Sequence, residues 1–100
     1  MFTIIWESKD DEVLYELSHP NNESYLIQNP NDYKILGEFC IDDYDVFSSI
    51  QMDAIILELE QLKKELLTKD DVYHINEIID LANKCKNLPD SRLIFTPFQK

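Results

Sequence analysis

The sequence contains a single glycine, Gly37, among its 100 residues. Glycine-rich phosphate loops and dinucleotide fingerprints need several residues without a Cβ, because the phosphates of the ligand lie directly against the backbone. One glycine cannot build such a loop. The sequence therefore excludes most classes of nucleotide-binding enzyme.

Basic residues are also scarce. Nine lysines and arginines stand against 20 aspartates and glutamates, which gives a net charge of −11. A protein with this charge repels nucleic acid and anionic membrane surfaces, and it attracts basic proteins. We therefore expect no nucleic-acid or membrane binding, and we expect that any protein partner is cationic.

Only two cysteines are present, and they are widely separated. Cys40 and Cys85 do not form a CxxC pair, so the sequence contains neither a zinc knuckle nor a redox motif. The apolar residues 2–6 run directly into an acidic segment, unlike a signal peptide, which has a basic start and a longer apolar stretch. The sequence predicts a cytoplasmic protein that needs no metal and no cofactor.

Composition is that of a globular domain, with 44% hydrophobic and 29% charged residues. A chain of this length buries roughly two-thirds of its unfolded surface, which is enough for one modest core. We therefore expect a single domain over residues 1–100.

Short alternating or β-branched segments occupy the N-terminal half, with polar turns between them. Four are predicted strands: residues 2–6, 13–17, 25–28 and 33–41. The second is short enough to be one helical turn instead. Gly37, inside the fourth, indicates a bulge or a close backbone approach.

The apolar period then changes to that of a helix. A capping-box pair, Ser48 and Gln51, starts a predicted helix that continues to Leu66. A second helix follows over residues 72–85, and residues 92–96 return as a last strand. The apolar stripe of the first helix consists of Met52, Ile55, Ile56, Leu59, Leu62 and Leu66. The fold class is therefore α+β, a small antiparallel-rich sheet of about four to five strands with a two-helix hairpin packed on one face.

The negative charge is concentrated in one stretch. Seven acids and no base lie between Lys34 and Lys63, and two aromatic residues are interleaved with them. Tyr44 stands between two aspartates, and burying it would draw a carboxylate inward at a cost of several kcal/mol. It is either an exposed anchor in a protein-binding loop or a ring packed along the sheet edge. The candidate partner-binding residues are Glu38, Asp42, Asp43, Tyr44, Asp45, Phe47, Asp53 and Glu58.

Catalytic and metal-binding patterns are weak. Counted as a calcium loop from Asp43, the sequence fails after two ligands, although the acidic loop could still hold a divalent ion weakly. His19 and His74 have no nucleophile at a useful spacing, and we expect both to be exposed to solvent. Cys85 lies on an apolar helix stripe and is expected to be buried. Trp6 is interpreted as a core residue rather than an interface anchor. We predict that the protein is not an enzyme.

The whole chain resembles the immunity proteins of bacterial contact-dependent growth inhibition and other polymorphic-toxin systems, which are small acidic α+β domains without catalytic residues. The resemblance is one of charge and architecture. It is carried by these segments: residues 25–28, 35–39, 42–47, the acidic helix after Ser48, and 93–98.

The resemblance implies a cognate partner, a basic toxin domain that is commonly an RNase or a DNase. It implies inhibition of the toxin either by covering its active site or by locking it from an adjacent surface. We expect the chain itself to be a monomer or a weak dimer. No binding residue carries over, because contact surfaces differ among such families. Two alternatives remain: a nucleic-acid mimic that inhibits a DNA-binding enzyme, and an adaptor subunit of a larger complex.

Overall fold

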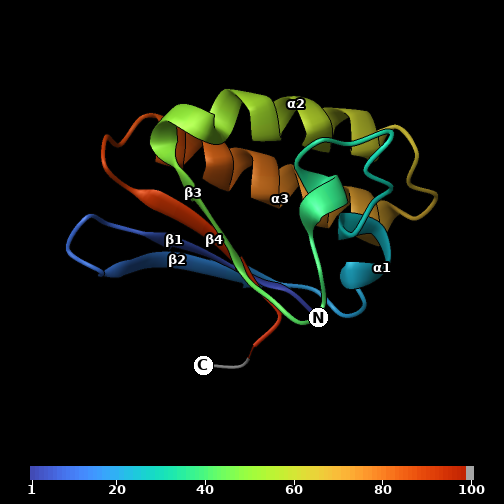
Figure 1. The fold of residues 1–100 in the computed structure, drawn as a ribbon, viewed down its shortest axis with the longest axis horizontal. Helices are drawn as coiled ribbons and strands as arrows, with labels where there is room; N and C mark the ends of the chain where they lie inside the picture. Colours follow the sequence, from blue (N-terminus) through green and yellow to red (C-terminus); the bar gives the residue numbers. More distant parts are fainter. Residues whose placement is uncertain (99–100) are drawn as a thin grey trace.

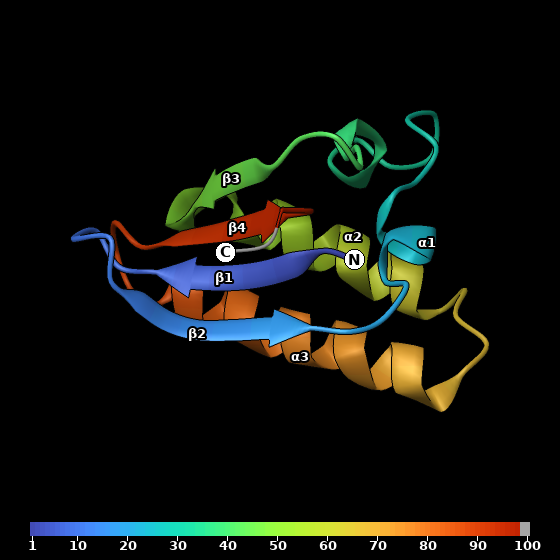
Figure 2. The same cartoon turned by 90° about the horizontal axis from the view of Figure 1, so that it is seen from below.

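A computed structural model describes residues 1–98 as a four-stranded antiparallel sheet with two long helices packed on one face (Figure 1). The strands are β1 (Thr3–Glu7), β2 (Val13–Ser18), β3 (Asp45–Ser48) and β4 (Arg92–Thr96), in the order β2-β1-β4-β3. The long helices are α2 (Met52–Lys63) and α3 (Lys69–Lys86). In the described residues no helix covers the opposite face, which Figure 2 shows from below. The α+β architecture predicted from the sequence is confirmed.

The two long helices begin at the polar signals that the sequence contains. Ser48 and Gln51 form the expected capping box, which opens a 3₁₀ turn, η2 (Ser49–Gln51), before α2. At α3, the backbone N–H of Asp71 donates to Thr68 Oγ1 at 3.2 Å. None of the helices in residues 1–98 combines the length and the apolar character needed to cross a lipid bilayer.

β1 is a central strand, and its neighbours come from opposite ends of the chain. Ile4 pairs with Leu17 of β2 on one side and with Phe95 of β4 on the other. All three side chains are buried under the helices. The predicted strands at residues 2–6, 13–17 and 92–96 are therefore confirmed within one residue at each end.

Two predicted strands are wrong. Residues 25–28 overlap a helical turn, α1 (Glu23–Leu26), and residues 33–41 form a loop that contains a 3₁₀ turn, η1 (Leu36–Glu38). Local hydrogen bonds give the physical reason. The N–H of Leu26 donates to the carbonyl of Asn22 at 2.9 Å, so the backbone is satisfied within one helical turn rather than by a neighbouring strand.

In the second segment the buried residues Tyr33, Leu36 and Phe39 recur every three positions, which is the period of a 3₁₀ helix. Gly37 is nevertheless a point of close approach, as expected. A Cβ at Gly37 would lie 2.4 Å from the Cα of Pro30.

β3 lies where the sequence analysis expected an acidic loop. Asp45 pairs with Phe95, and Phe47 pairs with Leu93, so this short strand forms one edge of the sheet. Because only four residues pair and one is charged, alternation alone could not reveal it. β3 brings the acidic segment onto the rigid sheet.

Candidate protein-binding face

The acidic residues gather where the segment after η1 leads into β3. Six residues define what we call the acidic face: Glu38, Asp42, Asp43, Tyr44, Asp45 and Phe47. Burial raises the pKa of Asp45, and the negative charges of Asp43 and Glu38 raise it further. Residues from η1, the loop and the strand therefore act on one another electrostatically.

A rigid aromatic cluster supports this face from below. Phe47 of β3 stacks on Phe39 with ring centroids 6.0 Å apart, and Phe39 lies 5.0 Å from Phe95 of β4. Phe2 completes the cluster at 5.8 Å from Phe39. Phe47 is therefore partly buried and packs beneath the acidic face. A different residue occupies the outermost aromatic position of this face.

That position belongs to Tyr44, whose side chain is 54% exposed. Its backbone N–H donates to Asp43 Oδ1 at 2.8 Å, which fixes the turn immediately before β3. Tyr44 is therefore largely exposed and is not a ring covered along the sheet edge.

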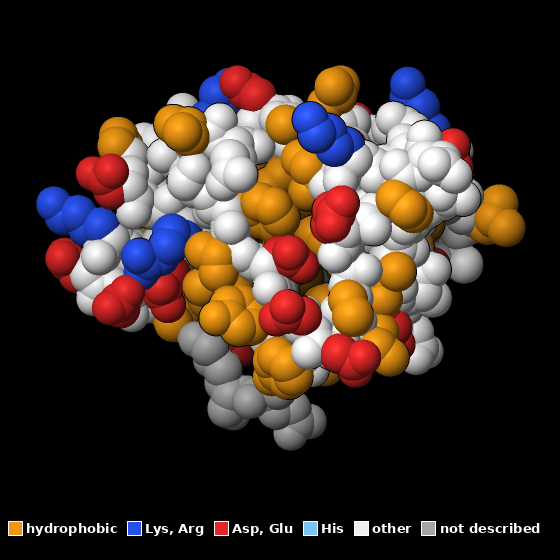
Figure 3. Space-filling view, in the orientation of Figure 1, with side chains coloured by type: hydrophobic (Ala, Val, Ile, Leu, Met, Phe, Trp, Pro, Cys, Tyr) orange, Lys and Arg blue, Asp and Glu red, His pale blue; other side chains and the backbone are white. Residues whose placement is uncertain are grey.

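Apolar side chains that the sequence analysis did not select lie in the same stretch of chain as Tyr44. Ile41 and Val46 are exposed near it in sequence, and Ile50, in η2 beyond the other end of β3, is 90% exposed. Figure 3 shows apolar side chains gathered near the middle of this side of the molecule, between β3 and the segment after η1, with acidic side chains beside them. The sequence does contain a signal for these residues, because they are aliphatic residues inside an otherwise acidic run.

Two of the candidate residues have structural contacts of their own. The Glu58 carboxylate accepts hydrogen bonds from the backbone N–H groups of Ile35 and Leu36 at 2.9–3.0 Å, and so it fastens η1 to α2. Asp53 Oδ1 lies 2.7 Å from Lys86 Nζ, an ion pair between α2 and α3. Glu58 therefore holds η1 on α2, whereas the Asp53 side chain pairs with Lys86 and stays 75% exposed.

The expectation that both histidines are exposed is wrong for His74, which is 1% exposed. Its ring stacks on His19 with centroids 5.1 Å apart, and His19 Nε2 lies 3.5 Å from Asp71 Oδ1. Burial lowers the pKa of His74 to about 4, with a smaller contribution from His19. A buried, neutral ring already engaged with Asn22 is poorly placed to act on a substrate.

Cys85 and Trp6 lie close to their expected environments. Cys85 is buried, and the burial raises the pKa of its thiol, so the nucleophilic thiolate is disfavoured. Cys40 is an exposed free thiol. Trp6 packs partly buried against the core. Within residues 1–98, no group of three or more His, Cys, Asp or Glu side chains is placed to hold a metal ion.

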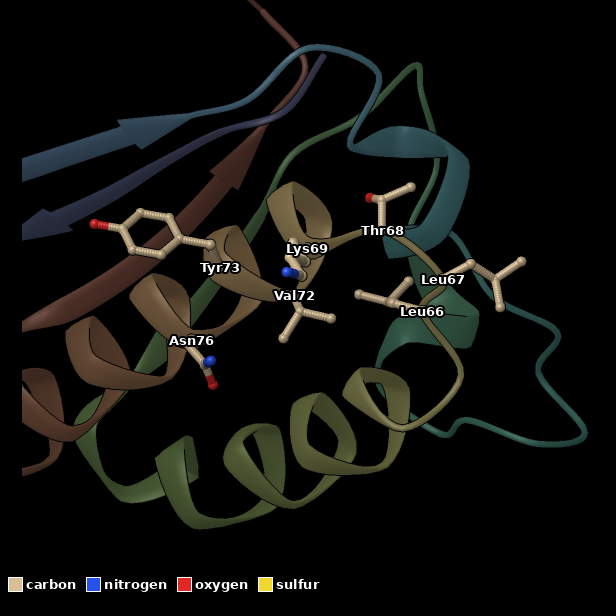
Figure 4. Close-up of a pocket in the computed structure, with 7 residues that line it drawn as sticks. All are labelled: Leu66, Leu67, Thr68, Lys69, Val72, Tyr73 and Asn76. Atoms are coloured by element: carbon tan, nitrogen blue, oxygen red, sulfur yellow. The ribbon is translucent and has the colours of Figure 1, made fainter.

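A separate hollow of about 340 Å³ lies between the end of α2 and the start of α3. Figure 4 shows Leu66, Val72 and Asn76 directed into the gap between the two helices. The hollow is mainly apolar, and Lys63 Nζ lies 3.1 Å from Asn76 Oδ1 near it. It shares no residue with the acidic face, and it offers a distinct surface against which binding at that face can be tested.

No protein-family model, curated protein or solved structure matches the chain. We therefore infer its function from its own residues.

Proposed function

We propose that this chain is a cytoplasmic immunity protein that binds a basic protein toxin domain through the acidic face and blocks its nuclease activity. In this proposal the chain has no catalytic activity and acts by binding alone. The observation that carries the proposal is the exposed Tyr44, set between two aspartates in the turn that leads into the edge strand β3.

Electrostatics support a basic partner. A nuclease presents lysine and arginine to the phosphate backbone of its substrate, so its active-site surface complements a face of carboxylates. The residues of that face carry four negative charges and no positive one, within a protein of net charge −11. Complementary fields of this kind can raise association rates to roughly 10⁸–10⁹ M⁻¹s⁻¹ at low salt.

The composition of the face supports tight binding. Interface hot spots are enriched in tyrosine and tryptophan, surrounded by contacts that exclude water. Tyr44 is such an aromatic group, and Ile41 and Val46 provide apolar area beside it. A purely solvating acidic loop would not require these three side chains.

The size of the protein is adequate. Its accessible surface is 6092 Å². A standard interface takes about 800 Å² from each partner, so the acidic face and its immediate surroundings could supply it. A nucleic-acid mimic is less well supported, because these carboxylates cluster around one tyrosine rather than lying in an extended row like phosphates.

The kinetic test uses the C-terminal domain of a large secreted protein encoded beside this chain, which the proposal requires. The double variant Asp43→Lys, Asp45→Lys should slow association at least tenfold at low salt and weaken its salt dependence. Tyr44→Ala should instead raise the dissociation rate, with an affinity loss of about 2 kcal/mol, or roughly 30-fold. Stopped-flow or surface-plasmon measurements separate the two effects.

The matched control is Asp10→Lys, Asp80→Lys, which makes the same change of net charge at exposed positions outside the acidic face. It should leave the dissociation rate unchanged and reduce the association rate less than the Asp43, Asp45 pair does. Equal effects of the two double variants would contradict the proposal. If the double variant Leu67→Ala, Tyr73→Ala lost binding while the acidic-face variants still bound normally, the interface would lie at the α2–α3 hollow. Binding to several unrelated DNA-binding enzymes would favour the mimic.

A further inference from the structure

Asn22 joins the start of β1 to the turn before α1. It is fully buried, and its side chain makes two hydrogen bonds with the backbone of Phe2. The N–H of Phe2 donates to Asn22 Oδ1 at 2.6 Å, and Asn22 Nδ2 donates to the carbonyl of Phe2 at 2.8 Å. These two bonds fix which end of the amide faces Phe2.

His74 of α3 lies on the other side of the same amide. The second N–H of Asn22 Nδ2 faces His74 Nε2 at a distance of 3.2 Å. Because Asn22 donates here, His74 Nε2 must accept, and the proton of the neutral ring must be on Nδ1. That Nδ1 is buried without a hydrogen-bond partner in residues 1–98, and the nearest carboxylate oxygen, Glu77 Oε1, is 3.9 Å away.

We propose that His74, Asn22 and Phe2 form an acid-sensitive latch, which holds the start of β1 at neutral pH and releases it when His74 gains a proton. In the protonated ring Nε2 carries a hydrogen and faces the N–H of Asn22, donor against donor. Turning the amide of Asn22 would present its oxygen to His74 but would break both bonds with Phe2. A proton on His74 and an intact bond pair at Phe2 therefore exclude each other.

The charges around His74 come from several elements. His19, in the β2–α1 connection, stacks on the ring and opposes its protonation. Asp71 of α3, which lies 3.5 Å from His19, favours it, and Glu77 of α3 faces Nδ1. Tyr25 of α1 is electrostatically linked to Asp71 and has a buried hydroxyl that stays neutral, because burial raises its pKa. Burial of His74 outweighs the carboxylates, and its pKa is lowered to about 4.

The direction of the pH effect follows from this shift. The pKa of His74 is about 4 in the folded protein, whereas that of an unperturbed histidine is 6.5. The stabilisation is therefore complete above pH 6.5 and is lost as the pH falls toward 4, because the unfolded or opened chain binds the proton more tightly. Between pH 7.5 and 4.5 the open fraction at this site should rise roughly 100-fold.

Release at Phe2 reaches other parts of the core. The Phe2 ring packs against Phe39, which stacks on Phe47 of β3. Opening the latch therefore loosens the aromatic cluster from its β1 side. The latch acts whatever partner the protein binds.

The first test is NMR on the wild-type protein. Imidazole nitrogen shifts should show His74 as the Nδ1–H tautomer at pH 7.5. The protection factor of the Phe2 amide, corrected for intrinsic exchange, should fall roughly 100-fold by pH 4.5 along the titration of His74. An Nε2–H tautomer, or a Phe2 amide that stays equally protected while His74 titrates, would overturn the latch.

Two variants extend the test. In His74→Gln the new side-chain oxygen can accept from Asn22 but cannot titrate, so most of the acid-induced loss of protection at Phe2 should disappear. In His19→Gln the stacked imidazole that lowers the pKa of His74 is gone, so the gap to the ordinary histidine value narrows and the acid-induced loss of protection at Phe2 should be smaller than in wild type. If folded His74→Gln lost as much protection at Phe2 in acid as the wild type does, the proposal would be contradicted. If His74→Gln does not fold, the wild-type and His19→Gln measurements decide.

Discussion

Glu58 shows how one side chain can have a role different from the one its charge suggests. It belongs to the acidic run, but its carboxylate accepts from two backbone N–H groups at the start of η1. A partly buried carboxylate that satisfies two backbone donors contributes more than an exposed charge does, because its removal leaves those donors unpaired. Its role is therefore to hold the loop that precedes the acidic face.

We expect Glu58→Ala to lower the free energy of unfolding by about 2 kcal/mol. Glu58→Gln should lose less, because the amide oxygen still accepts. The control is Glu60→Ala on the same helix, which breaks only a half-exposed pair with Lys63 and should cost less than about 0.5 kcal/mol. Urea denaturation measures all three, and equal losses at the two glutamates would contradict the assignment.

Gly37 is constrained by space rather than by backbone angle. A Cβ there would lie 2.4 Å from the Cα of Pro30, and backbone atoms cannot move aside cheaply. Gly37→Ala should therefore destabilise the protein by roughly 1–3 kcal/mol, the usual cost of overpacking. Lys34→Ala, at an exposed position in the same loop, should change stability little. Thermal melts with matching midpoints for the two variants would show that the loop can relax.

At the scale of elements, the sequence predicted best where one period continued for several turns. The stripes of α2 and α3 and the alternation in β1 and β4 are of this kind, and each lies within a residue or a few residues of its predicted position. The predictions for α1 and η1 were wrong because one helical turn contains too few residues to distinguish its period from that of a strand. The sequence analysis missed β3 because a short edge strand with an acidic residue shows almost no hydrophobic alternation.

Three consecutive residues of α2 test its orientation. Ile55 is 1% exposed, Ile56 is partly buried and Leu57 is 71% exposed. Ile55→Asp should unfold the protein, since an unpaired buried carboxylate costs several kcal/mol against a total stability of roughly 5–15 kcal/mol. Ile56→Asp should be intermediate, and Leu57→Asp should be nearly neutral. Far-UV circular dichroism during urea titration gives the order, and a reversal of Ile55 and Leu57 would refute the packing.

For the whole molecule, the net charge could be predicted from the sequence, but the placement of the charged residues in the fold could be predicted only in part. The run of acids and Tyr44 could be selected without coordinates, because an aromatic residue between two aspartates resists burial. The separate roles of Asp53 and Glu58 could not be predicted, because their partners, Lys86 and the backbone of residues 35–36, are distant in sequence. The burial of His74 likewise depends on Asn22 and His19, which only the tertiary fold brings to it.

The net charge of −11 leads to a prediction about the intact fold. Fourteen acids and two bases lie in residues 1–60, so this part of the chain repels itself even when folded. Screening lengths fall from roughly 30 Å at 0.01 M salt to about 8 Å at 0.15 M, and self-repulsion across the domain weakens accordingly. Raising NaCl from about 10 to about 150 mM should therefore raise the melting temperature by ~3–8 °C, the equivalent of about 1 kcal/mol.

MgCl₂ at the same ionic strength should give a similar rise, and a chelator should have no effect, because the acidic loop lacks the ligands that couple a metal to folding. A large stabilisation specific to Mg²⁺ or Ca²⁺, abolished by Asp43→Asn, would instead identify the acidic face as a cation site.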